Sequence, residues 1–521
     1  MKAIFNKFIA CSMAALAMSA CTGDFENINA NQYQPGSLDA DNYALTSSMY
    51  AVFGRVIPSD VNMTQFTDCL LGGTVGGYFA DGNQGFRDNQ IAAFNSNNGW
   101  TRVFMEANPN SIIPTVYVNL AIIEGYSETS GNMLPAHIAR LVKVAAMHRV
   151  TDCYGPIPYS KIGFDGSILT PYDSQEEVYN KFFEEIDECI AGFYECMDNV
   201  RAPLIDDVYQ TDPVKWIKFA NSLKLRLAMR ISYANPTLAQ KKAEEAIAGG
   251  VIESNADNAI YDHYKTGGNP IYGATIGYNN DSRPAADIVC YMNGYNDPRR
   301  AAYFSQAPDG SYIGVRRGWR VVPSFGLYSG LGIKATDGSI WMTAAEVSFL
   351  RAEAVAVFGW NMGGTAEQFY NNGIQLSFNQ YGCGDATDYI NDSTSQPELY
   401  SCPDNSNPYN GTISTITIKW DENASKEVKQ ERIITQKWIA NMYLGNEAWA
   451  DYRRTGYPKL IPPAMNASGG IVDSNKGAQR MPYPQEEYTN NSVNIHYAVD
   501  NYLGGPDNMA TKVWWACKPG I

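Results

Sequence analysis

Apolar side chains recur every three or four positions between Trp216 and Ser232, and this spacing predicts an amphipathic helix with one buried face. Asp212 and Pro213 stand where a helix begins, and Asn235–Pro236 stand where one ends. A helix with a wide apolar face needs partner helices to cover it. The apolar positions on this face are Trp216, Phe219, Ala220, Leu223, Leu227 and Ile231.

The same periodicity predicts partner helices along much of the chain, several of them in adjacent pairs. One helix opens with Ser174 and Glu177 placed as a capping box. Neighbouring helices that cover each other's apolar faces are typical of tetratricopeptide-like arrays, although no regular repeat of about 34 residues is visible here. The predicted helices are residues 44–56, 112–126, 135–150, 178–197, 238–248, 343–358, 365–378 and 424–452.

Two long insertions interrupt the predicted helices, at about residues 259–341 and 382–420, and both are rich in Gly, Asn, Asp and Tyr. A further Gly- and Asn-rich stretch with large aromatic side chains spans residues 71–100. Loops of this length are usually functional. We therefore expect a mostly α fold in which a tetratricopeptide-like scaffold of helix pairs carries long irregular loop insertions.

The aromatic and polar residues of these loops form a combination suited to binding sugars. A sugar ring has an apolar C–H face and hydroxyl groups at its edge, so it stacks on an aromatic ring flanked by hydrogen-bonding side chains. The first candidate cluster contains Tyr78, Phe79 and Trp100, with Asn83, Arg87 and Asn89. The second contains Tyr291, Trp319, Phe325 and Tyr328, with Asn293, Arg316 and Arg317. Many large aromatic side chains pack into the core, so we expect only some of these to be exposed.

The composition excludes a nucleic-acid-binding surface. The 521 residues carry a formal net charge of −15 without a basic run, whereas phosphate binding needs a concentrated basic face. The four histidines are not spaced with other ligands as a zinc site requires. Asp81, Asn83 and Gly85 begin like a calcium-binding loop, but Ala92 stands where such a loop has a glutamate. We predict neither a cofactor nor a bound metal.

No pair of acidic residues is placed for glycoside hydrolysis. Glu184–Glu185 and Glu244–Glu245 are adjacent on predicted helices, so the side chains of each pair point apart. We interpret Asp451, Arg453 and Arg454 as a structural ion-pair network, because a buried arginine normally pairs with a carboxylate. The chain is therefore predicted not to be an enzyme.

The N-terminus has the pattern of a signal peptide over residues 1–20, with Lys2 and Lys7 ahead of an apolar run that is too short to span a membrane. The cysteine that follows, Cys21, resembles the acylated residue of bacterial lipoproteins; an ordinary secretory signal is the alternative. Acyl chains on Cys21 would anchor the protein in a membrane. Residues 21–41 would then be a tether, and its acidic segment TGDFE resembles a tag for export to the cell surface.

Distinctive segments occur along the chain in this order: YGPIPYSKIGF (154–164), TPYDSQEEVYNKFFEEID (170–187), WIKFANSLKLRLAMRIS (216–232), DPRR (297–300), AEVSFLRAEA (345–354), IITQKWIANMYLGNEAWADYRRTGYPKL (433–460) and RMPYPQEEYTNN (480–491). Together they resemble SusD/RagB-like lipoproteins. The resemblance implies a single helical domain at residues 42–521, on a tetratricopeptide-like scaffold. It also implies that the protein binds nutrients, most often oligosaccharides, without altering them chemically. The bound nutrients would be delivered to a SusC-like TonB-dependent outer-membrane transporter.

The resemblance leaves the ligand and its contacts open. The binding residues of the family lie in loops that do not align by motif, so none carries over to this chain. The resemblance also implies that the protein is lipid-anchored in the outer membrane and faces the cell exterior. Two alternatives stay open, a surface lipoprotein glycoside hydrolase and an uptake lipoprotein that binds peptides, because aromatic and polar clefts serve glycans and peptides alike.

Overall fold

The computed structural model describes residues 40–95, 99, 104, 111–163, 169–197, 206–263 and 268–521. The predicted signal peptide, the lipidation residue Cys21 and the candidate binding residue Trp100 lie outside the described residues. The internal contacts divide the chain into two units, residues 1–47 and 48–521. Helix α3 (Ala40–Phe53) contains the boundary, and all the other described elements belong to the second unit.

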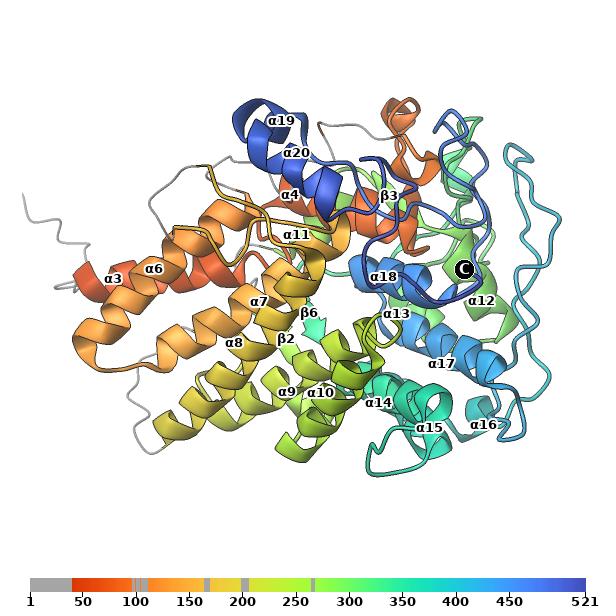
Figure 1. The fold of residues 1–521 in the computed structure, drawn as a ribbon. Helices are drawn as coiled ribbons and strands as arrows, with labels where there is room; N and C mark the ends of the chain where they lie inside the picture. Colours follow the sequence, from red (N-terminus) through yellow and green to blue (C-terminus); the bar gives the residue numbers. More distant parts are fainter. Residues whose placement is uncertain are drawn as a thin grey trace, which may run out of the picture. The chain divides into compact units, whose positions relative to one another are not determined.

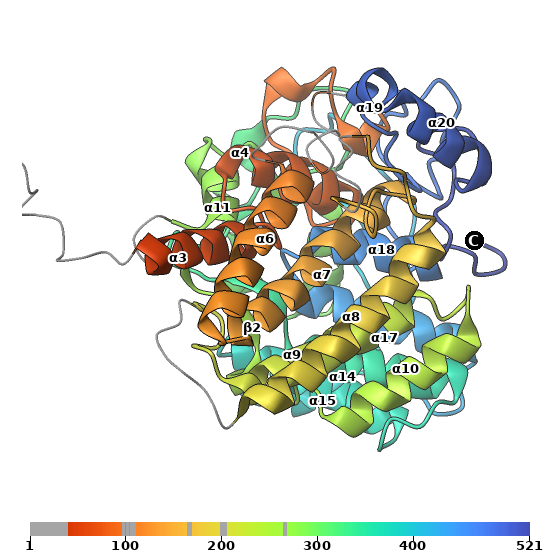
Figure 2. The same ribbon diagram turned by 60° about the vertical axis from the view of Figure 1, so that its left-hand side comes forward.

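The second unit is built mainly from α-helices. They include α6 (Ile112–Ser130), α7 (Leu134–Tyr154), α8 (Gln175–Cys196), α9 (Pro213–Arg230), α10 (Pro236–Gly249), α14 (Ala344–Glu353), α15 (Ala366–Gln380), α17 (Lys426–Ala440) and α18 (Gly445–Thr455). Helices α6 to α10 each pack against the next in the chain, and α14 packs against both α15 and α17. Figure 2 shows α6, α7 and α8 lying beside one another. This is the predicted scaffold of helix pairs.

Helix α9 is enclosed on more sides than its amphipathic pattern predicts. Asp212 caps it, because its side chain accepts hydrogen bonds from backbone N–H groups of the first turn. The predicted apolar face is buried, and so are the arginines on other faces. Arg226 pairs with Glu346 at 2.7 Å and Arg230 pairs with Asp152 at 2.6 Å. These ion pairs with neighbouring helices allow charged side chains to be buried.

One prediction about the helices is confirmed and another is wrong. The capping box at Ser174 and Glu177 is confirmed, since both of its hydrogen bonds are present at the start of α8. The pattern at residues 424–452 is two helices, α17 and α18, separated by a turn in which Tyr443 has a φ of 80°. Apolar residues continue at helical spacing through this turn, so periodicity alone does not reveal the break.

Helix α18 packs against a segment that the periodicity did not predict as helical. This segment is the π-helix η1 (Gln65–Gly73), which continues the short helix α4 (Val61–Thr64). The contact depends on two glycines: a Cβ atom added at Gly445 would lie only 2.4 Å from the carbonyl carbon of Gly72. The absence of side chains here allows the two backbones to approach.

We expect Gly445→Ala to lower the free energy of unfolding by about 1–3 kcal/mol, because the new methyl group meets backbone atoms that cannot rotate away. Urea denaturation measures the change. Gly326→Ala is the matched control, since a Cβ there has no atom within 4 Å, and it should change stability by less than about 0.5 kcal/mol. Equal stability of the two variants would contradict the close packing of α18 on η1.

Within the described residues, three antiparallel pairs of short strands tie the loops together. They are β1 (Phe79–Asp81) with β3 (Ser282–Pro284), β2 (Ala259–Tyr261) with β6 (Ser339–Met342), and β4 (Phe304–Ser305) with β5 (Gly330–Leu331). The pairing of β1 with β3 joins the predicted loop at residues 71–100 to the insertion at 259–341. Segments from the two candidate aromatic clusters thereby become neighbours.

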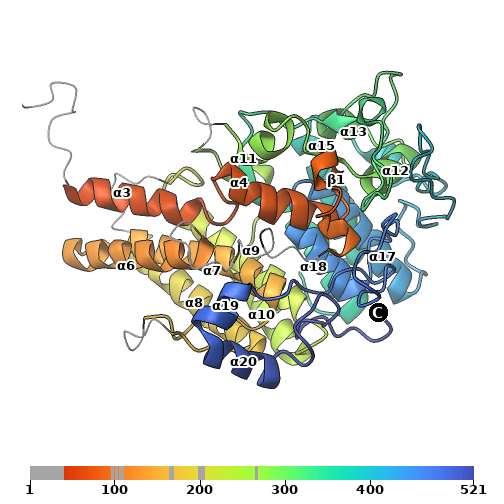
Figure 3. The ribbon, with the colours of Figure 1, turned by 90° about the horizontal axis from the view of Figure 1, so that it is seen from above.

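Short helices fill the rest of the loop regions. They are η2 (Gln84–Phe86), η3 (Ile91–Ala93), η6 (Asn255–Asp257), α11 (Pro270–Tyr272), η8 (Gly273–Gly277), α12 (Ala286–Gly294), α13 (Arg300–Tyr303), η9 (Phe325–Leu327), η10 (Ala354–Phe358), α16 (Thr387–Ile390), α19 (Gln485–Asn490) and α20 (Ser492–Asn501). Figures 1 and 3 show α12 and α13 on the side away from α6 and α8. Among the described residues, no helix combines the length and apolar character needed to cross a membrane.

Candidate functional site

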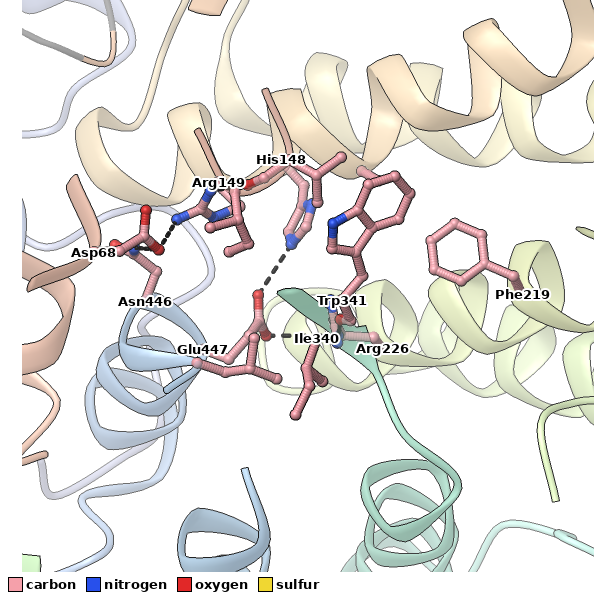
Figure 4. A pocket seen from close by; sticks show the side chains of 13 residues that line it. Asp68, His148, Arg149, Phe219, Arg226, Ile340, Trp341, Asn446 and Glu447 are labelled. Atoms are coloured by element: carbon pink, nitrogen blue, oxygen red, sulfur yellow. Dashed lines mark hydrogen bonds and ion pairs between the residues drawn. The ribbon is translucent and has the colours of Figure 1, made fainter. Parts of the chain in front are cut away.

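A small cavity lined by both charged and apolar side chains lies inside the helical scaffold (Figure 4). Its volume is about 20 Å³, which is enough for a water molecule but not for a sugar ring. His148 and Glu447 point toward each other, with 3.0 Å between Nε2 and Oε1, and Arg149 pairs with Asp68. The indole N–H of Trp341 has no acceptor among the described residues. Since the charged side chains named here are paired, we interpret this cavity as structural.

The ion-pair network predicted around α18 is confirmed in part. Asp451 pairs with Lys437 at 2.7 Å and with Arg454 at 3.1 Å. Arg453 is held differently: its guanidinium carbon lies 3.6 Å from the ring centroid of Trp449, and its Nη1 donates to two backbone carbonyl oxygens. A carboxylate partner is not needed, because the flat aromatic ring and the carbonyl groups replace it.

Three of the predicted binding aromatics belong to the core. Tyr78 and Tyr291 pack against Trp438, with ring centroids 5.6 and 5.3 Å away. Their hydroxyl groups donate to the backbone carbonyl oxygens of Trp438 and Lys459, at 2.6 and 2.9 Å. Phe79 is 1% exposed. Among the described residues, Trp438 packs on Tyr78 and Tyr291 and Tyr443 packs on Phe79, so these buried rings do not present a face to a ligand.

The other three aromatic residues of the second cluster, Trp319, Phe325 and Tyr328, belong to a small core that also contains Ala80 and Val315. Trp319 is fully buried, and its indole N–H donates to the carbonyl oxygen of Asp81 at 2.8 Å. Tyr328 is also buried and donates its hydroxyl to Asp404 at 3.0 Å. Phe325 packs edge-on against Trp319 with ring centroids 6.0 Å apart, but stays partly exposed. Of the predicted aromatics that the structure describes, Phe325 alone is partly exposed.

Further side chains around Phe325 are exposed. Val321 and Leu327 are 53% and 44% exposed, and Val322 is exposed as well. The guanidinium carbon of Arg283 lies 5.8 Å from the centroid of the Phe325 ring. We call these five residues the Phe325 surface. It offers an apolar face beside a cationic hydrogen-bond donor, which are the two features that a sugar ring requires.

Most of the polar residues predicted beside the second cluster have other partners. Arg317 is buried and pairs with Asp287 at 2.8 Å. Arg316 donates to the carbonyl oxygen of Pro462 at 3.0 Å. Arg87, from the first cluster, is exposed. The polar contribution to the Phe325 surface therefore comes from Arg283, which the sequence analysis did not single out.

A concave region beside α18 was not predicted from the sequence. Its volume is about 320 Å³, and it is lined by residues that include Tyr409, Tyr452, Lys459, Asn475 and Gln479. The size and the mixture of aromatic and polar side chains suit a small ligand. Tyr409 belongs to the insertion at 382–420. Tyr452 lies in a helix, and nothing in the sequence marks it as a ligand-binding residue.

The carboxylate of Asp81 is buried. Asp81 is 0% exposed, and neither of its oxygens accepts a hydrogen bond from the residues that the structure describes. Burial, with a smaller contribution from the negative charge of Asp281, raises the pKa of Asp81 to about 7. A raised pKa is typical of a general acid. Asp81 has no exposed surface, however, so it cannot reach a glycosidic bond.

We expect Asp81 to make stability pH-dependent in buffer free of divalent cations. Its pKa is about 7 in the folded protein against an ordinary value of 3.8, so ionisation opposes folding. Its contribution to the free energy of unfolding should fall as the pH rises from about 4 to about 7, by as much as about 4 kcal/mol. In the Asp81→Asn variant this decrease in the free energy of unfolding should be absent. Urea denaturation at a series of pH values measures it for both proteins. Parallel curves for the two proteins would contradict the raised pKa.

Comparison with known proteins identifies the family of this chain. The family described as "SusD-like: Susd and RagB outer membrane lipoprotein" matches residues 26–516. The chain belongs to the SusD-like family. The resemblance seen in the sequence segments is thereby confirmed, and the family description makes this SusD-like chain a member of a family of outer-membrane lipoproteins.

Solved structures give the same result. A SusD homolog from Bacteroides uniformis ATCC 8492 is 55% identical with a TM-score of 0.88, over 91% of this chain and 100% of the other. One from Bacteroides ovatus ATCC 8483 is 37% identical with a TM-score of 0.84, over 92% and 100%. A chitin-binding SusD homolog from Flavobacterium johnsoniae is 35% identical with a TM-score of 0.81, over 91% and 99%. No curated protein sequence matches the chain. The mostly α, SusD-like fold is confirmed.

Proposed function

We propose that this SusD-like protein binds glycans at the cell surface and delivers them, chemically unchanged, to a SusC-like TonB-dependent outer-membrane transporter. The observation that carries the proposal is the similarity, at 35% identity over 91% of this chain, to a SusD homolog that binds chitin. The family description as outer-membrane lipoproteins supports a lipid anchor at Cys21 after removal of residues 1–20. In this proposal the anchored protein faces the cell exterior.

The Phe325 surface is the proposed ligand contact. The accessible face of Phe325 would stack on a sugar ring while Arg283 donates to its hydroxyl groups. Trp319 packs edge-on against Phe325, and Asp404 fixes the loop through Tyr328 and through the backbone N–H of Ser324 at 2.5 Å. A ring held by such contacts loses little conformational freedom on binding.

The placement of the acidic residues supports binding without catalysis. Glu184 pairs with Lys181 at 3.1 Å on the surface, whereas the adjacent Glu185 pairs with Lys143 at 2.8 Å. The two carboxylates therefore point apart, as adjacent positions on a helix require, and do not face each other across a sugar. Asp81 has a raised pKa but is enclosed. Binding is the function that these positions favour over glycoside hydrolysis.

Native gels cast with single polysaccharides, chitin derivatives included, test this proposal. We expect at least one glycan class to retard the purified protein, and we expect no new reducing ends in the same mixture. Retardation with release of reducing ends would indicate the glycoside hydrolase instead. If no glycan retards the protein and a peptide mixture binds to it, the peptide-binding alternative would replace our proposal.

A further inference from the structure

Unsatisfied oxygen atoms gather where β1 pairs with β3. Asp81 lies directly opposite Ser282 in this pair, so their side chains lie on the same face. Both carboxylate oxygens of Asp81 and the hydroxyl oxygen of Ser282 are buried, and none of them has a hydrogen-bond partner among the described residues. Buried oxygens without partners are costly, so the site calls for a ligand that supplies positive charge.

The residue that precedes Ser282, Asp281, carries a second carboxylate, whose negative charge acts on Asp81. The side chain of Asp281 accepts hydrogen bonds from Asn83 Nδ2 at 2.7 Å and from Gln65 Nε2 at 2.9 Å. Its backbone oxygen accepts from the N–H of Gly82, next to Asp81, at 2.7 Å. Both side-chain donors are neutral amides, and each carboxylate oxygen keeps a lone pair for another partner. Asp281 is therefore oriented but not neutralised.

In the part of the chain that the structure describes, no basic side chain forms an ion pair with either carboxylate. Among the described residues, neither Asp81 nor Asp281 takes part in an ion pair with Lys, Arg or His. The nearest arginine along the chain, Arg283, lies over the ring of Phe325 and donates through Nη1 to the carbonyl oxygens of Tyr328 and Ser329, at 3.4 and 3.3 Å. Buried charges are normally paired or bound to a metal ion.

We propose that Asp81, Asp281 and Ser282 form a binding site for a divalent cation, with Ca²⁺ as the preferred ion. Carboxylate and hydroxyl oxygens are the ligands that hard cations take, and Ca²⁺ accepts irregular sets of oxygens where Mg²⁺ requires a regular octahedron. The ion would neutralise both carboxylates and satisfy the serine oxygen. Within the described residues no cluster of three or more His, Cys, Asp and Glu side chains suits a metal, so backbone oxygens or water complete this coordination.

The proposed site differs from the calcium loop that the sequence analysis excluded. In that motif all the ligands come from one short segment. Here the second carboxylate, Asp281, comes from the segment ahead of β3, which the strand pairing brings to Asp81. The ion would bind β1 to β3 and so fix Trp319, whose indole contacts the carbonyl of Asp81, beneath the Phe325 surface.

Terbium luminescence tests the cation site, because Tb³⁺ replaces Ca²⁺ at oxygen sites and is excited by energy transfer from a nearby indole. Trp319 is that indole, with its Nε1 2.8 Å from the Asp81 carbonyl oxygen. We expect metal-stripped protein to give saturable emission that Ca²⁺ displaces more effectively than Mg²⁺. Asp81→Asn should weaken Tb³⁺ binding by about tenfold or more. Asp309→Asn, on an exposed turn, is the matched control and should bind as the wild type does.

The results separate the proposal from its alternatives. Weakened binding in Asp81→Asn with unchanged binding in Asp309→Asn supports the site. If Asp81→Asn does not fold, Asp281→Asn removes the second ligand and is expected to show the same loss. Equal binding by all variants would mean an adventitious ion and would overturn the proposal. The proposal would also be overturned if Tb³⁺ gave no emission and the protein retained no radiolabelled calcium in equilibrium dialysis.

Discussion

Glu447→Ala should lower the free energy of unfolding by about 3 kcal/mol or more, because it removes the anion at the centre of a buried network. Glu447 accepts a hydrogen bond from His148 on α7 at 3.0 Å and binds Arg230 on α9. Arg226 on α9 lies 3.7 Å from the same carboxylate. The substitution leaves the guanidinium groups of Arg226 and Arg230 buried without the Glu447 carboxylate. Urea denaturation measures the loss.

The pKa of Glu447 predicts how this stability depends on pH. Burial raises that pKa, but Arg230 and Arg226 outweigh burial and hold it well below its ordinary value. The contribution of the network is therefore fully present above the pKa of an unfolded glutamate and is lost as the pH falls below it. Glu253→Ala is the control, since Glu253 is 66% exposed and pairs with Arg351 at the surface, and it should cost less than about 1 kcal/mol. Equal losses in the two variants would contradict the structural role of the network.

Phe325→Ala should weaken binding to the retained glycan by about tenfold or more, because it removes the accessible ring of the Phe325 surface. The thermal stability should change little, since the ring is partly exposed and its loss leaves Trp319 in place. Affinity gels at a series of glycan concentrations measure the change. Unlike this substitution, Trp319→Ala would also disturb the core and would not separate binding from folding.

The control for Phe325→Ala is another exposed aromatic residue on the scaffold. Tyr194 is 54% exposed and lies on α8. Tyr194→Ala should bind the glycan as the wild type does. If both variants lose affinity equally, or if Phe325→Ala binds normally, the ligand contact lies elsewhere, and the cavity lined by Tyr409 and Tyr452 becomes the next candidate.

The helical scaffold was predictable because its signals are local. The cap at Ser174 and the apolar spacing after Trp216 each act within one or two helical turns, so the sequence displays them directly. The burial of Arg226 and Arg230 could not be predicted in the same way, since it depends on carboxylates such as Glu346 from distant helices. The break near Tyr443 was hidden by apolar residues that continue across it.

The candidate site was predictable only in composition. The loops do carry the aromatic residues expected, but Tyr78 and Tyr291 are covered by Trp438, which comes from a remote helix. Nothing in the local sequence distinguishes them from Phe325, whose ring stays accessible. The approach of Asp81 to Asp281 depends on the pairing of β1 with β3, and spacing along the chain gives no sign of it.

The central claim is that this SusD-like protein binds a glycan and does not alter it. The most direct test is calorimetric titration with an oligosaccharide of the class that retards the protein, followed by chromatography of the recovered ligand. We predict saturable binding and an oligosaccharide of unchanged length. Shortened products would contradict the account by showing catalysis, and the absence of binding to any glycan would contradict it by removing the ligand class.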